Sequence, residues 1–241
     1  MRLSKSSIND RAAWEAINVK LPQFDIDEVA KNTKEKPQWV HFGAGNIFRG
    51  FIANAHQKLL DSGKANTGII AVESFDFEVI DKVYKPFDNL TLLVLMNADG
   101  HFDKTVVASI PEAITADKNR AEDYNRLIEI FETPSLQMAS FTITEKGYSL
   151  TDASGNYLGI VKNDIENGPE NPVHTMSLVT ALAYRRYKKG KYPMTFVSMD
   201  NCSHNGDKIK NAVLTIAKEW LERGFVEKDF IDYLEDESKI T

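Results

Sequence analysis

Two glycines separated by one residue give the first indication of chemistry in this chain of 241 residues. The segment Gly43-Ala44-Gly45 follows a short apolar run and precedes a helical pattern. A glycine at the first position lets the chain turn tightly, and one at the second lets the backbone approach a diphosphate without an intervening Cβ. We therefore expect the amides around Gly43 and Gly45, at the positive end of the following helix, to form an anion cradle for a dinucleotide.

The motif departs from the usual Gly-x-Gly-x-x-Gly pattern, because Phe48 occupies the position of the third glycine. The helix must then stand further from the sheet or pack against it through the aromatic ring. A short glycine motif is weakly specific, so a tight turn without a ligand is the alternative. Seven consecutive residues are predicted to contact the cofactor: Gly43, Ala44, Gly45, Asn46, Ile47, Phe48 and Arg49.

An acidic residue, Glu73, ends the second predicted strand. A carboxylate there can accept hydrogen bonds from both hydroxyls of the adenosine ribose, and it would repel a 2′-phosphate. The sequence therefore predicts NAD as cofactor, with NADP less favoured. Asp76 competes for the same role, and a solvated glutamate at the end of a strand is the alternative.

Two further polar clusters follow predicted strands, at 144–148 and 200–206. Polar groups at the carboxyl ends of parallel strands line the crevice of open α/β sheets. On composition alone the first cluster is a turn. In the second, the Asn201 amide is suited to stabilising a developing alkoxide. His204 and Cys202 lie beside it, but a lone loop histidine is usually solvated and the cysteine has no evident histidine partner.

Metal binding is not predicted. The five histidines are scattered, no pair has the spacing of a helical zinc site, and there is one cysteine.

The elements that must position these residues alternate between strand and helix. An apolar strand at 39–42, a helix at 47–60 and a strand at 68–72 form a βαβ unit. Asp99-Gly100 between two extended runs predicts a hairpin, and a second hairpin is expected around 151–156. Residues 1–36 look polar and irregular. Later strands are expected at 138–144 and 194–199, and helices at 124–131, 173–187, 205–220 and 225–234.

This order predicts an α/β fold, an extended Rossmann-like doubly wound sheet that is mostly parallel with antiparallel hairpin additions. With 42% hydrophobic and 27% charged residues, the chain can bury a sizeable core. A net charge of −6 argues against nucleic-acid binding. The N-terminus shows no secretory signal and the longest apolar run is too short to span a bilayer, so we expect a cytoplasmic protein without membrane partners.

With these clusters in place, the sequence resembles the polyol-specific long-chain dehydrogenases, the family of mannitol 2-dehydrogenase, fructuronate reductase and tagaturonate reductase. The matching segments occur in the family's order and cover most of the chain. They are 21–25, 41–49, Thr144-Glu145-Lys146-Gly147-Tyr148 and Ser198-Met199-Asp200-Asn201, followed by Asn205-Gly206.

The resemblance implies NAD(P)-dependent interconversion of a secondary alcohol and a ketone, usually without metal. Thr144 and Glu145 match positions near the cofactor, and Asn201 matches a contribution to oxyanion stabilisation. The family's general base is a lysine of a helical C-terminal domain, which Lys146 does not replace. We expect residues 1–241 to be one NAD(P)-binding domain with an N-terminal extension at 1–36, lacking that helical domain and turning over poorly alone.

The forms of the 144–148 and 200–206 clusters look closest to the uronate reductases. The predicted reaction is interconversion of D-fructuronate and D-mannonate, with mannitol 2-dehydrogenase or tagaturonate reductase activity as alternatives. Two other classes stay open. One is a non-catalytic nucleotide-binding module, and the other is an S-adenosylmethionine-dependent methyltransferase, which shares the glycine turn. Oligomeric state is left open.

Overall fold

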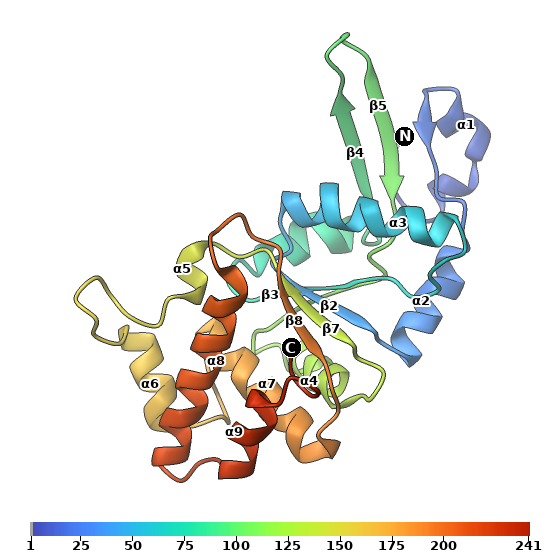
Figure 1. The fold of residues 1–241 in the computed structure, drawn as a ribbon. Helices are drawn as coiled ribbons and strands as arrows, with labels where there is room; N and C mark the ends of the chain where they lie inside the picture. The colour runs from blue at the N-terminus through green and yellow to red at the C-terminus, as the bar shows by residue number, and fades with distance from the viewer. Residues whose placement is uncertain (1) are drawn as a thin grey trace. The chain divides into compact units, whose positions relative to one another are not determined.

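The computed structural model describes residues 2–241, which divide into two compact units. Unit 1 ends at Asp117, and unit 2 is Lys118–Thr241. Both units contain parallel strands and helices, as Figure 1 shows. The predicted α/β class is therefore confirmed. Within the described residues, no helix is both long and apolar enough to cross a membrane.

Three parallel strands carry the first part of the candidate site in unit 1. β2 (Trp39–Phe42) pairs with β3 (Ile70–Glu73), which also pairs with β6 (Glu112–Thr115). The apolar side chains at the centre of β2 and β3 are fully buried, as expected for strands covered on both faces. The strand predicted at 68–72 is confirmed with small shifts at its ends, so the glycine turn and Glu73 both follow neighbouring parallel strands.

The helical segment between β2 and β3 has two parts. It begins with a π-helical turn, η2 (Phe48–Ile52), and continues as α3 (Ala53–Asp61). Gly63, at φ +68°, follows the helix end, where a left-handed backbone conformation favours glycine. The apolar pattern of the sequence is only partly buried: Phe48, Ile52 and Leu60 face the core, whereas Ile47, Phe51 and Leu59 are exposed.

The expectation that residues 1–36 are irregular is wrong. This segment contains η1 (Ser7–Asn9), α1 (Arg11–Glu15), β1 (Val19–Lys20) and α2 (Ile26–Glu35). The physical reason is a small apolar core of its own, which outweighs the polar composition of the segment. That core contains Ile8, Trp14, Val19, Leu21, Leu90, Val106 and Ala108.

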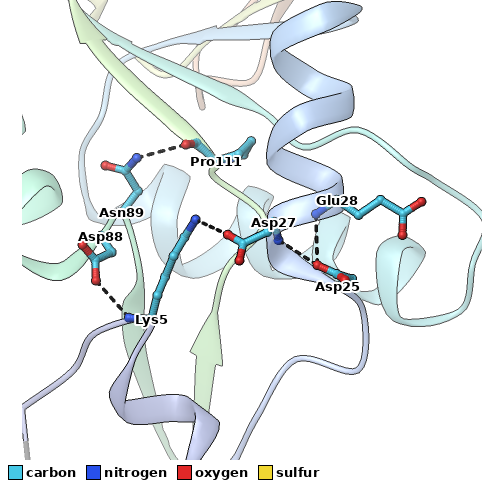
Figure 2. Close-up of polar contacts among 7 residues, drawn as sticks. All are labelled: Lys5, Asp25, Asp27, Glu28, Asp88, Asn89 and Pro111. Atoms are coloured by element: carbon cyan, nitrogen blue, oxygen red, sulfur yellow. Dashed lines mark hydrogen bonds and ion pairs between the residues drawn. The ribbon is translucent and has the colours of Figure 1, made fainter.

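Side-chain contacts around α2 also hold the N-terminal segment, as Figure 2 shows. The Asp25 carboxylate accepts hydrogen bonds from the amides of Asp27 and Glu28 at 2.9 and 3.0 Å, which caps the helix. Lys5 donates to Asp27 at 2.8 Å through Nζ, and to Asp88 at 2.9 Å through its backbone amide. Asp25 is a helix-capping residue that the sequence itself contains, but the polar composition of residues 1–36 obscured this signal.

The predicted hairpin is present, but it belongs to a sheet of its own. β4 (Thr91–Met96) and β5 (Phe102–Val107) pair antiparallel around the turn that contains Gly100, at φ +85°. β1 pairs parallel with β5, which gives the strand order β1-β5-β4. The hairpin therefore does not extend the parallel strands of unit 1 as expected. In Figure 1 it projects beyond α3.

In unit 2, β7 (Met138–Phe141) and β8 (Thr195–Ser198) run parallel, with Phe141 opposite Ser198. Helix α7 packs against its neighbours α4, α8 and α9. The second hairpin is reduced to one antiparallel bridge between Thr151 and Tyr157. The predicted helices are present with shifted ends, and α5 and α6 are additions. The helices are α4 (Ala121–Glu132), α5 (Glu145–Tyr148), α6 (Gly159–Asn167), α7 (Thr175–Gly190), α8 (Asn205–Glu222) and α9 (Lys228–Glu235).

A buried arginine, Arg186, holds together the chain segments that precede the two strands of unit 2. The side chain of Arg186 donates to five backbone carbonyls at 2.7–3.0 Å. These carbonyls lie at the end of α4, on the segment between α4 and β7, and on the segment that leads into β8, so one side chain holds the chain before both strands. Its buried charge serves the fold, and its donors are satisfied within the unit.

Candidate functional site

The glycine turn at the end of β2 has the geometry that the sequence predicts. Gly43 adopts φ +103°, a conformation that favours glycine. At Gly45 an added Cβ would meet no atom within 4 Å. Packing within the protein therefore gives no reason for glycine at position 45, whereas close approach by a ligand would.

The backbone amides of the turn divide into two groups. Gly43 donates to the carbonyl of Val72 at 2.9 Å, and Ala44 donates to Glu73 Oε2 at 3.1 Å. The expectation that the Gly43 and Ala44 amides face a ligand is thus wrong, because strand and carboxylate already use them. In the described chain, the amides of Gly45, Asn46 and Ile47 have no hydrogen-bond partner. The available donors begin at Gly45.

The Glu73 carboxylate lies against this turn. Besides the Ala44 contact, its Oε1 accepts from the amides of Ser74 and Phe75, both at 3.0 Å, and more weakly from Asp76 at 3.4 Å. Such backbone donors hold the carboxylate in one orientation. The structure thus brings Glu73 and the glycine turn together. Asp76, the competing acidic residue, contributes its amide to Glu73.

The aromatic residue at the third glycine position packs against the sheet through its ring. Phe48 stacks on His41 of β2 with ring centroids 4.1 Å apart and an interplanar angle of 9°, and both side chains are fully buried. Burial lowers the pKa of His41 to about 3, so the imidazole is neutral at pH 7. The second of the two packing modes considered from the sequence is confirmed.

Arg49 and Tyr84, a residue that the sequence did not single out, complete this region. The Tyr84 hydroxyl donates to the carbonyl of Ala44 at 2.8 Å, and the Arg49 guanidinium lies 5.8 Å from the Tyr84 ring centroid. Arg49 also donates to Asn46 Oδ1. Its Nε is buried and finds no acceptor within residues 2–241. A guanidinium with one unmet donor beside three unpartnered amides favours an anionic ligand.

The second candidate region lies in unit 2, where α5 and the segment after β8 meet. The Tyr148 hydroxyl contacts Ser198 Oγ at 3.0 Å and donates to Asp200 Oδ2. The same carboxylate oxygen accepts from the Ile143 amide at 3.2 Å. Glu145 of α5 pairs with Lys208 of α8, which lowers the pKa of Glu145 and raises that of Lys208. The turn expected at 144–148 is therefore a short helix.

Asn201 lies directly after Asp200 and is exposed. Its side-chain amide has no partner in the part of the chain that the structure describes. The structure thus places Thr144 and Glu145 in a segment that is joined to the Asn201 segment through Asp200. The sequence contained this signal, because Tyr148 and Asp200 both fall within its motifs, but nothing in the sequence indicated that they touch.

Residues 37–238 match the family model described as the mannitol dehydrogenase Rossmann domain. The chain belongs to this family. It is 54% identical over 235 residues to a D-mannonate oxidoreductase of Thermotoga maritima, covering 98% of the chain and 43% of that protein. It is also 29% identical to a polyol:NADP oxidoreductase of Gluconobacter oxydans, covering 83% of the chain and 40% of the relative.

Two solved structures resemble the whole chain. One is the mannitol 2-dehydrogenase of Pseudomonas fluorescens in a ternary complex with NAD and D-mannitol, with a TM-score of 0.79 and 22% identity, covering 45% of that chain. The other is a D-sorbitol dehydrogenase in substrate-free form, with a TM-score of 0.74 and 26% identity, covering 51% of that chain. They show that the fold is Rossmann-type. The chain spans less than half the length of the two curated relatives named above.

Proposed function

We propose that this chain binds the diphosphate of a nicotinamide dinucleotide at the turn after β2. The observation that carries the proposal is the group of unpartnered amides at Gly45, Asn46 and Ile47, above a position where a Cβ would meet open space. The orphaned Nε of Arg49 adds positive charge at the same place. Gly43, Ala44 and Phe48 shape this turn, and Thr144 and Glu145 of unit 2 are proposed to contact the cofactor.

NAD is the proposed cofactor rather than NADP. Glu73 presents a fixed carboxylate beside the turn, where it would accept hydrogen bonds from the ribose hydroxyls and repel a 2′-phosphate. Its Oε1 already accepts from three backbone amides, so Oε2, which accepts from the Ala44 amide, is the oxygen proposed to meet a ribose hydroxyl. The Gluconobacter oxydans relative is named a polyol:NADP oxidoreductase, so the binding of NADH is compared directly with that of NADPH below.

The proposed reaction is interconversion of D-fructuronate and D-mannonate by the protein to which this chain contributes. The 54% identity to a D-mannonate oxidoreductase supports this substrate pair over mannitol or tagaturonate. Bound NADH supplies the hydride in such chemistry. Asn201 would donate a hydrogen bond to the substrate oxygen as negative charge develops on it. The general base is proposed to come from a helical C-terminal domain of that protein. The setting we propose is cytoplasmic.

Fluorescence titration and thermal shift with NADH, NADPH and S-adenosylmethionine test the cofactor proposal. NADH should bind most tightly and stabilise the fold. Arg49→Gln should weaken NADH binding about tenfold, as expected for loss of a charge-assisted hydrogen bond. Lys58→Gln, which removes an exposed cation further along α3, is the matched control and should not. Stabilisation by S-adenosylmethionine instead of NADH would overturn the proposal.

A further inference from the structure

Asp200, which follows β8, is bonded to the 143–148 segment more than fifty residues earlier and to the start of α8. Its Oδ2 accepts from the Tyr148 hydroxyl of α5 and from the Ile143 amide that follows β7. Its backbone carbonyl accepts from Asn205 Nδ2, in the first turn of α8, at 2.9 Å. The residue is thus held through its side chain on one side and its main chain on the other.

These contacts fix Asp200, and Asn201 is the next residue in the chain. The Asn205 contact closes a short loop from position 200 to the start of α8, and Asn201 is the first residue inside that loop. Its own side chain is exposed and receives no partner from the described residues. Since Asn201 is not held by its own amide group, its position depends on Asp200.

We infer that Tyr148 and Asp200 are positioning residues, whose contact fixes the segment that carries Asn201 and so aims the Asn201 amide at the substrate oxygen. This inference rests on the proposed function, in which Asn201 donates that hydrogen bond. Tyr148 and Asp200 themselves have no contact with substrate or cofactor in this account.

The chemistry of the two groups suits a fixed contact. Tyr148 is 4% exposed, and its burial, together with the Asp200 contact, raises the pKa of its hydroxyl, which therefore stays protonated and donates. Burial raises the pKa of Asp200, while the hydrogen bonds from Tyr148 and the Ile143 amide lower it. The tyrosine donor and the amide thus offset part of the cost of placing a carboxylate there.

Removal of one hydroxyl group tests the inference. In the full-length protein to which this chain contributes, Tyr148→Phe keeps the ring in its buried place and should lower kcat for fructuronate reduction about tenfold or more, since small misplacements of a catalytic group are costly. The KM for NADH should change less than about twofold, because the Tyr148 hydroxyl contacts Ser198 and Asp200 and has no proposed contact with the cofactor. Tyr157→Phe is the matched control, because it removes a hydroxyl bonded to Glu219 at 2.9 Å in the same unit and should leave kcat unchanged.

A double variant decides whether Tyr148 acts through Asn201. If it does, Tyr148→Phe combined with Asn201→Ala should lose no more activity than Asn201→Ala alone, since the two changes share one effect. Additive losses would overturn the inference. Asp200→Asn retains an acceptor oxygen and should keep more activity than Asp200→Ala.

Amide hydrogen exchange gives a readout that does not depend on turnover. Tyr148→Phe should raise exchange in 199–206 about fivefold or more and leave α7 unchanged, because only local protection is lost. Unchanged exchange in 199–206 would overturn the inference even if the wild-type protein reduces fructuronate. Full-length wild-type protein that binds no NADH and turns over no fructuronate would instead refute the proposed function, and the exchange result would still decide whether Tyr148 and Asp200 hold this segment.

Discussion

The two candidate regions use different chemical groups to meet a ligand. In unit 1, backbone amides form the site, and the side chains beneath them are aromatic: Phe48 stacks on His41, and Tyr84 holds the Ala44 carbonyl. In unit 2, the candidate donor is a side chain, Asn201, on a segment held by polar side-chain contacts. The first region can bind a diphosphate, which takes no part in the reaction. The second can place one side-chain amide beside a reacting oxygen.

This difference bears on how each region tolerates mutation. A backbone site depends on space above the amides and on the packing below them, so a change of volume or of buried charge should damage it. A side-chain site depends on a few hydrogen bonds, so removal of a single oxygen atom should damage it without unfolding the unit. The following variants change the backbone site in unit 1, and their effects can be compared with that of Tyr148→Phe in unit 2.

The largest effect is expected from adding one methyl group at Gly45. Gly45→Ala should fold normally, because its Cβ meets no atom within 4 Å, but the methyl group would lie where a diphosphate must approach. We expect a loss of NADH affinity of about 100-fold, or about 2.8 kcal/mol. Fluorescence titration measures it. Gly159→Ala, at another glycine with open space, is the control. Equal NADH binding by all three proteins would mean that Gly45 has no ligand role.

A smaller effect should appear in the pH dependence of stability. The pKa of His41 is about 3 in the folded protein, against an ordinary value of 6.5 for an exposed histidine. Below pH 6.5 the His41 imidazole binds a proton in the unfolded chain but stays neutral in the folded protein. The contribution of His41 to the free energy of unfolding is therefore fully present above pH 6.5 and is lost progressively as the pH falls to about 3.

Urea unfolding at pH 7 and pH 5 measures this loss. His41 should account for about 2 kcal/mol of the difference between the two pH values, since one pKa unit corresponds to about 1.4 kcal/mol. His41→Gln should lose less on acidification by that amount, whatever its stability at pH 7. Identical pH dependence in the two proteins would show that the Phe48–His41 stack does not exclude the charged imidazole.

The sequence predicted the parallel strands, the glycine turn and the hairpin because each has a local signal: an apolar run, a Gly-x-Gly after it, an Asp-Gly pair. It did not predict which amides are free, because the contact between Ala44 and Glu73 joins the turn after β2 to the end of β3. Tyr84 carried no signal at all, since its role arises only through its distant contact with Ala44. The N-terminal helices were missed because their small apolar core is completed by Leu90, Val106 and Ala108, which lie far along the chain.

The account depends most on the amides of Gly45, Asn46 and Ile47 being the donors that meet the cofactor. Titration of ¹⁵N-labelled protein with ADP and then NADH, followed by the backbone amide resonances, tests this residue by residue. We predict saturable shifts of these three amides with both ligands, because both carry the diphosphate, and smaller shifts at Gly43, whose amide stays bonded to Val72. Saturable binding that leaves the three amides unmoved would contradict the account.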